Sequence, residues 1–141
     1  MQNPPPGQQT SMGLAQNVAA ALAYIWIVGL IFFFIEKENK FVRFNGMQSV
    51  LYGVLWMVIF IALMIVSVII TIVGGVASTA AGDAGGIIGI LLSLIQLLVW
   101  LIVPLLYFGG LILAAVKAYQ NKVFKFPLIG NFAEKFAGGV S

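Results

Sequence analysis

Long apolar runs dominate this sequence and set its predicted elements. Three runs, at about residues 14–35, 50–74 and 87–116, contain no charged residue. The first has 22 residues, and as an α-helix it would be about 33 Å long, enough to cross the roughly 30 Å hydrocarbon core of a bilayer. We therefore predict an all-α integral membrane protein with three transmembrane helices in a single membrane domain, residues 14–136.

The charged residues decide between three spans and four. Lys37, Lys40 and Arg43 lie between the first and second runs, and the other four lysines follow the third run. No basic residue precedes the first run, and the only charged residue in the loop between the second and third runs is Asp83. Because basic residues collect on the cytoplasmic side, three spans place both basic groups there, whereas four spans would separate them. We predict an inner-membrane protein with its N-terminus outside and its C-terminus inside; four spans are the alternative.

The polar stretch after the first run, about residues 36–47, is predicted to be a short amphipathic helix at the membrane surface. Phe41 and Phe44 are three residues apart and share a helix face, while Lys40 and Arg43 lie on another side. Such a helix can lie at the headgroup level with its rings toward lipid and its charges outward. It would act either as an elbow that sets the topology or as a docking surface for a partner.

A second interfacial helix is predicted at about residues 127–137. Pro127 should break any helix that continues from the third run. After it, Leu128, Phe132 and Phe136 recur every fourth residue and so share one face. We expect the two interfacial helices to form a cytoplasmic collar. The candidate partner-contacting or lipid-contacting residues of the collar are Lys40, Phe41, Arg43, Phe44, Gln48, Pro127, Leu128 and Phe132.

The two ends of the chain are predicted to be tails. Residues 1–13 are rich in proline and glutamine and contain no lysine or arginine. They therefore lack the basic region of a signal peptide, and their composition indicates a disordered tail. Residues 137–141 form a short second tail.

Composition narrows the chemistry. Hydrophobic residues make up 62% of the chain and charged residues 8%, with a net charge of +3 and neither cysteine nor histidine. This excludes disulfides and thiol chemistry and removes the usual metal ligands and the usual general base. Glu36 and Glu38 point to different helix faces, and Asp83 stands alone. We predict no enzyme, no catalytic residue, no metal and no cofactor. The basic residues flank the spans as topology signals, so we predict no nucleic-acid partner.

A few polar side chains fall inside the predicted spans. They are Ser67, Thr71, Ser93 and Gln96. An amide left unpaired in lipid is costly, so Gln96 is predicted to make an interhelical polar contact, within the chain or across subunits. Its alternative role is to line a polar pathway.

Two blocks of sequence carry a family resemblance. "EKENKFVRF", followed by "MQS", comes after the first run, and "KAYQNKVFKFPLIGNFAEKF" comes after the last. Together they resemble small prokaryotic membrane proteins related to the roughly twenty-kilodalton subunit of the chloroplast Tic translocon, largely a family of unknown function. The resemblance covers about residues 14–136. Asn45 stands where a histidine is expected, which removes the only titratable imidazole of the block, and Asn121 stands where glycine is usual.

The resemblance implies a role rather than a reaction. The chloroplast members belong to the machinery that moves preproteins across the inner envelope and are described with four spans. We therefore expect a non-enzymatic scaffold or accessory subunit of a protein-translocation-type or other membrane complex. In the lipid bilayer, its collar would dock a membrane-protein partner or a second copy of the chain. The alternatives are an oligomeric pore or uncoupled small-solute carrier, and a lipid-sensing membrane protein.

Overall fold

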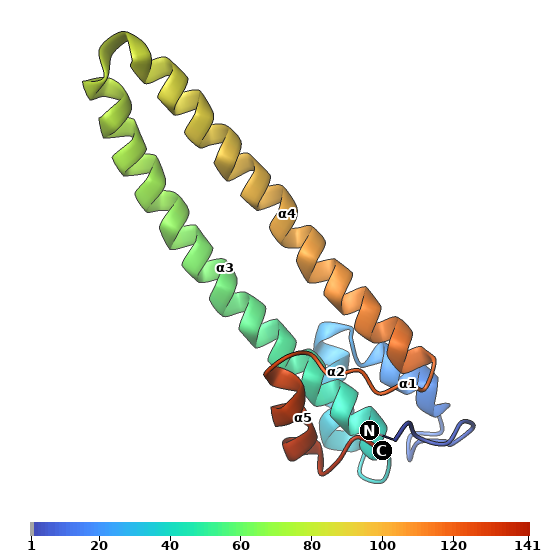
Figure 1. Ribbon diagram of the computed structural model, residues 1–141. Coiled ribbons are helices and arrows are strands. Elements are labelled where there is room, and N and C mark those ends of the chain that lie inside the picture. The colour runs from blue at the N-terminus through green and yellow to red at the C-terminus, as the bar shows by residue number, and fades with distance from the viewer. Residues whose placement is uncertain (1) are drawn as a thin grey trace. The chain divides into compact units, whose positions relative to one another are not determined.

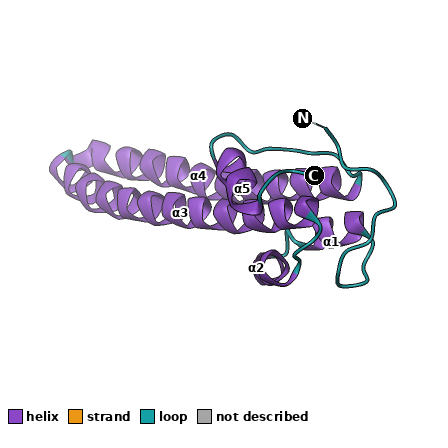
Figure 2. Cartoon of the chain, turned by 90° about the horizontal axis from the view of Figure 1, so that it is seen from below, coloured by secondary structure: helices purple, strands orange, loops and turns teal. Residues whose placement is uncertain are grey.

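The protein is all-helical. The structure is a computed structural model and describes residues 2–141, among which no β-strand is formed. Figures 1 and 2 show helices joined by turns and loops, the connection between α4 and α5 being an extended loop. The elements are α1 Gln16–Leu22, α2 Trp26–Ile35, α3 Lys40–Ala80, the 3-10 helix η1 Gly82–Ala84, α4 Gly85–Tyr119 and α5 Ile129–Ala137. The all-helical class predicted from the apolar runs is confirmed.

The described residues divide into two compact units. Unit 1 combines residues 2–55 with residues 109–141, and unit 2 is Trp56–Phe108. Both long helices, α3 and α4, contribute residues to each unit. The buried core and the candidate site lie in unit 1.

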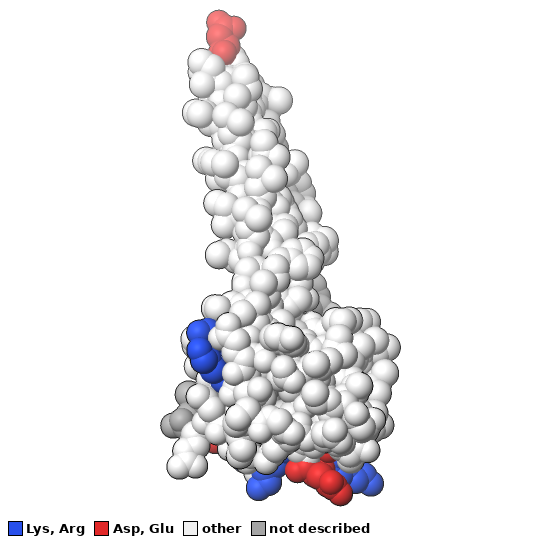
Figure 3. All heavy atoms as spheres, turned by 90° about the vertical axis from the view of Figure 1, so that its right-hand side faces the viewer, with Lys and Arg blue, Asp and Glu red and all other residues white. Residues whose placement is uncertain are grey.

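Unit 2 is an antiparallel helical hairpin closed by η1 (Figure 1). Its helices meet through small and aromatic residues. A Cβ on Gly85 would lie 1.8 Å from the carbonyl oxygen of Ser78, so only glycine fits there. The rings of Phe60 and Trp100 meet edge to face with centroids 5.2 Å apart. On the face shown in Figure 3, the sides of this hairpin carry no charged atoms, and the acidic group lies at the tip with η1.

Two helices are long and apolar enough to cross a membrane, namely α3 and the stretch Gly82–Tyr119 that contains η1 and α4. They include the runs predicted at 50–74 and 87–116. The first predicted span is not a single helix. Residues 14–35 form α1, with 7 residues, and α2, with 10, separated by a turn at 23–25. α2 is about 15 Å long, which is half the thickness of a hydrocarbon core. The described residues therefore contain two helices of spanning length, and not the three that were predicted.

The break between α1 and α2 has a local and a long-range cause. Tyr24 N–H and Ile25 N–H donate to carbonyls only three residues back, Ala21 at 3.1 Å and Leu22 at 2.9 Å, which tightens and ends α1. The Tyr24 side chain is buried, and its hydroxyl donates to Asn45 Oδ1 at 2.8 Å. A straight helix through residues 14–35 would lose this bond.

The predicted interfacial helix at 36–47 is not a separate helix. Residues 36–39 form a turn, and Lys40 begins α3 directly. The turn forms because two side chains accept hydrogen bonds from backbone groups at the start of α3. Asn39 Oδ1 accepts from Val42 N–H at 3.1 Å, and Glu36 Oε1 accepts from Asn39 N–H at 3.0 Å. Both bonds satisfy donors that a helix N-terminus leaves free.

The N-terminal segment differs from the expected disordered tail. Asn3 Oδ1 accepts from Val123 N–H at 2.8 Å, and the Pro5 carbonyl accepts from Gln16 Nε2 at 3.2 Å. Thr10 N–H donates to the carbonyl of Leu14 at 2.9 Å. Residues 2–13 are therefore tied to unit 1 by polar contacts that their composition does not reveal. Met1, which the prediction included in this tail, lies outside the described residues.

Candidate functional site

The interior of unit 1 combines small and aromatic side chains from four elements. Its main apolar cluster draws on α1, the 23–25 turn, α3 and α4 and contains Ala19, Ala20, Tyr24, Phe41, Val42, Ala114 and Ala118. The alanines allow close helix approach. At the edge of the cluster the Tyr52 ring stacks on Phe126, with centroids 4.4 Å apart. The loop after α4 thereby becomes part of the core.

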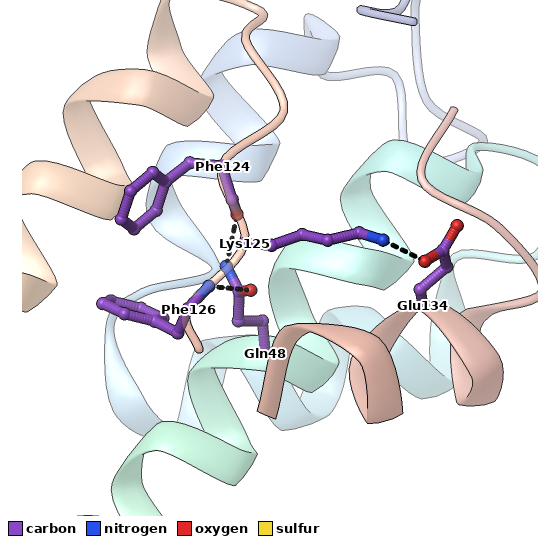
Figure 4. Close-up of polar contacts among 5 residues, drawn as sticks. All are labelled: Gln48, Phe124, Lys125, Phe126 and Glu134. Carbon is purple, nitrogen blue, oxygen red and sulfur yellow. Dashed lines mark hydrogen bonds and ion pairs between the residues drawn. The ribbon is translucent and has the colours of Figure 1, made fainter. Parts of the chain in front are cut away.

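Gln48 is the centre of a buried polar network. Its side chain is fully buried, and Nε2 donates to Tyr24 Oη at 2.7 Å and to the Phe124 carbonyl at 2.9 Å. Its Oε1 accepts from Phe126 N–H at 3.1 Å (Figure 4). One amide thus links α3 to the 23–25 turn and to the loop before α5. Among the described residues, no buried side-chain nitrogen or oxygen lacks a partner.

A second network joins the end of α4 to α1 and α3. Asn121 has φ 55°, and Lys122 N–H donates to the carbonyl of Lys117 at 2.9 Å, as in a helix-ending motif that favours glycine. Asparagine tolerates this backbone, which accounts for Asn121 at the position where glycine was expected. Its Oδ1 accepts from Gln16 Nε2 at 2.8 Å, and Gln16 Oε1 accepts from Asn39 Nδ2 at 2.8 Å.

Glu36 is a buried carboxylate held by backbone N–H groups. Its oxygens accept from Ser11 at 2.9 Å and from Glu38 and Asn39 at 3.0 Å each. Burial by itself raises the pKa of this carboxyl, but the N–H donors outweigh burial and hold the pKa below its usual value. Arg43 does not pair with the carboxylate, because its Nη1 donates to the Glu36 main-chain carbonyl at 3.0 Å.

Acid should weaken unit 1 through Glu36. Because the pKa of this carboxyl is lower in the folded than in the unfolded chain, its stabilisation is complete above the unfolded pKa of about 4.3 and is lost as pH falls through the folded pKa. We expect the free energy of unfolding in detergent micelles to decrease below about pH 4.5. Glu36→Gln should flatten this decrease, and the exposed control Glu38→Gln should keep it. Equal slopes in all three proteins would contradict the assignment.

The predicted contact residues separate into exposed and buried groups. Lys40, Pro127, Leu128 and Phe132 are exposed, and Arg43 is half-buried with its guanidinium 4.9 Å above the Phe33 ring. Three others are fully buried inside unit 1: Phe41, Phe44 and Gln48. The prediction that the two phenylalanine rings face lipid was wrong. They form one helix face, as their spacing indicates, but that face packs on alanines of α4 and α5.

The face of α5 that remains exposed is apolar and large. Small residues, Ala133 and Ala137, pack inward against Phe44. The outward side chains are 78%, 58% and 57% exposed, and they belong to Leu128, Phe132 and Phe136. We call these three residues the α5 face. Phe136 was not among the predicted contact residues, although the four-residue spacing places it there.

Leu128 adopts an unusual backbone conformation at the start of the α5 face. Its φ is 68° and its ψ is −62°, and Ile129 N–H donates to the Pro127 carbonyl at 2.8 Å, which closes a γ-turn. A γ-turn of this sign is rare and strained for a residue with a side chain. Beside it, Lys125 forms an ion pair with Glu134 (Figure 4). The γ-turn leaves the Leu128 side chain exposed.

Gln96 lies in unit 2, where Nε2 donates to Thr71 Oγ1 across the hairpin at 3.2 Å. A cleft of about 160 Å³ adjoins this contact. The serine hydroxyls that line it bond to their own helices, Ser78 to the Gly74 carbonyl at 2.7 Å and Ser93 to the Gly89 carbonyl at 2.8 Å. In the part of the chain that the structure describes, no group of three or more metal-ligating side chains is formed.

Comparison with known proteins gives a consistent set of relatives. A family described as the magnetosome magnetite crystal formation protein family matches residues 8–133. A UPF0132 membrane protein of Methanocaldococcus jannaschii is 30% identical over 132 residues, 92% of this chain and 94% of the relative. A UPF0132 membrane protein of Archaeoglobus fulgidus is 31% identical over 129 residues, 90% of this chain and 100% of the relative. No solved structure matches.

These matches correct the resemblance inferred from the two polar blocks. They show no link to the Tic translocon, and the family match covers both the first block and most of the second. Much of each block is internal to unit 1, with Gln48 bonded to Phe124 and Phe126. The two blocks therefore help to build the interior of unit 1. The chain belongs to the MamF/MmsF family of membrane proteins, which includes UPF0132 proteins of archaea.

Proposed function

We propose that this protein is a non-enzymatic membrane scaffold that is anchored by α3 and α4 and docks an apolar segment of another membrane protein on the α5 face. The observation that carries the proposal is the strained γ-turn that presents Leu128 beside Phe132 and Phe136. Fluid lipid accepts any apolar side chain and gains nothing from a fixed, strained backbone. A shaped protein partner does gain from it, because a preorganised surface loses less entropy on binding.

The remaining polar groups support a scaffold rather than an enzyme. The Glu36 carboxylate accepts hydrogen bonds from backbone N–H groups, and Glu134 forms an ion pair with Lys125. The buried amides of Gln48 and Asn45 bond to the fold itself. An oligomeric pore has less support, because the hydroxyls of unit 2 bond to carbonyls of their own helices.

The family description concerns magnetite crystals, and for this chain we propose a role in the membrane rather than direct iron binding. The chain has four acidic residues and neither histidine nor cysteine. Iron sites in proteins draw on carboxylate, imidazole and thiolate ligands. A protein that organises partners within a membrane needs none of them.

We propose a cytoplasmic orientation for the ends of α3 and α4 that carry basic residues. If these two helices cross the membrane, Lys37 and Lys40 lie on the same side as Lys117 and the lysines that follow it. The connection through η1, with Asp83, lies on the other side. This distribution follows the positive-inside rule.

Docking on the α5 face can be tested by crosslinking in native membranes. A photoreactive residue at Phe132 should capture one defined membrane protein, whereas the same group at the exposed control Lys135 should not. Phe132→Lys should lower the co-purified amount of that protein by about tenfold, since truncating an interface aromatic costs roughly 1.4–2 kcal/mol. Capture of lipid alone at Phe132, or the same proteins at both positions, would overturn the proposal.

A further inference from the structure

The two ends of the apolar segment 14–35 meet at the same end of unit 1. Just before the segment, Ser11 N–H donates to Glu36 Oε2 at 2.9 Å, directly after it. One turn further on, Asn39 Nδ2 donates to Gln16 Oε1 at 2.8 Å. The chain therefore enters and leaves this segment at one place, which a transmembrane helix cannot do.

Within the segment, α2 runs back along the first turns of α3. Trp26 lies beside Gly53, where an added Cβ would be 3.4 Å from the indole Cδ1. Gly29 lies against Gly46, and Phe33 lies under the Arg43 guanidinium. The turn at 23–25 is thus level with the apolar part of α3, whereas the end of α2 is level with its charged start. The 10 residues of α2 reach about 15 Å, half the thickness of the hydrocarbon core.

The surface of this hairpin suits hydrocarbon and not water. Residues 14–35 carry no charge. Large apolar side chains around the turn and along α2 are about half to three-quarters exposed in unit 1, among them Ile25, Trp26, Ile27, Ile31 and Phe34. Exposed apolar surface of this extent marks a contact with lipid or protein.

The N–H groups of the turn itself are satisfied within the chain. Ala23, Tyr24 and Ile25 each donate their N–H to a carbonyl of α1, at 3.0, 3.1 and 2.9 Å. Non-helical backbone at membrane depth is tolerated where it is buried in protein, and Ala23 and Tyr24 are buried in unit 1.

We infer that residues 14–35 form a re-entrant hairpin, inserted among the acyl chains of one leaflet, with the 23–25 turn near the midplane. Residues 2–13 then lie on the same side of the membrane as Lys37. With α3 and α4 as the two spans, both ends of the chain share that side, which replaces the predicted N-terminus-out topology. The inference does not depend on the α5 face, since the hairpin and α5 present different surfaces.

Single-cysteine labelling tests the topology directly, because the chain contains no cysteine. Suitable positions are exposed in the structure, namely Ser11, Lys37 and Asp83. Each is replaced with cysteine in a separate variant, and each variant is treated with a membrane-impermeant maleimide in intact cells and in inverted membrane vesicles. Ser11→Cys and Lys37→Cys should react from one side and Asp83→Cys from the other. If Ser11→Cys instead reacts together with Asp83→Cys, the segment crosses the membrane and the hairpin is wrong.

Depth separates a re-entrant hairpin from one that rests on the membrane surface. Ile25→Cys should react about tenfold less than Ser11→Cys until detergent is added, because water is absent from the hydrocarbon core. A fluorophore attached at this position should be quenched more strongly by spin labels deep in the acyl chains than by headgroup labels. Strong quenching by aqueous iodide would place the turn in water and overturn the inference.

Discussion

Replacing Gln48 with leucine is expected to lower the free energy of unfolding by about 2–6 kcal/mol. The change removes the side-chain amide nitrogen that donates to Tyr24 Oη and to the Phe124 carbonyl. It also removes the amide oxygen that accepts from Phe126 N–H. Two partly buried main-chain groups then lack partners, at about 1–3 kcal/mol each. Reversible unfolding in mixed detergent micelles measures the loss.

The matched control is Gln96→Leu, the same substitution in the other unit. Gln96 makes one bond, to Thr71 at 3.2 Å, and the site is exposed. Interhelical hydrogen bonds of this kind average about 0.6 kcal/mol in membrane proteins, so the expected change is below about 1 kcal/mol. Equal losses from both substitutions would show that Gln48 does not organise unit 1.

Replacing Gly46 with leucine should force α2 away from α3. A Cβ at Gly46 would lie 2.6 Å from the Gly29 carbonyl oxygen, a main-chain atom that cannot rotate away. Overpacking costs typically about 1–3 kcal/mol, and a side chain of four carbons against backbone falls at or above about 3 kcal/mol. The unfolding free energy should decrease by this amount, and Ile25→Cys in the same background should become accessible to aqueous maleimide.

Gly75→Leu provides the control in the same helix. No atom lies within 4 Å of a Cβ built at Gly75, so the unfolding free energy should change by no more than about 0.5 kcal/mol. If Gly46→Leu were tolerated equally well, α2 would not be fixed on α3, and the depth assigned to the hairpin would lose its basis.

The sequence alone determined the helical class and the two long helices. The runs at 50–74 and 87–116 are uncharged and longer than the hydrocarbon core requires, so no competing pattern arises in them. It also indicated the outward face of α5, because Leu128 and Phe132 repeat every fourth residue after a proline that must end the preceding helix. Composition limited the side-chain chemistry, since absent residue types are absent in any fold.

Only the tertiary structure decided the course of residues 14–35 and the side to which Phe41 and Phe44 turn. In a membrane protein, lipid-facing and protein-facing positions are equally apolar. The spacing of residues therefore predicts which side chains share a helix face, but not whether that face contacts lipid or another helix. Likewise, an uncharged run of 22 residues has the length of a span. What bends it into α1 and α2 is the bonding of Tyr24 to Asn45 and Gln48, more than twenty positions away along the chain. Such contacts leave no periodic signal, because the residues that make them meet only after folding.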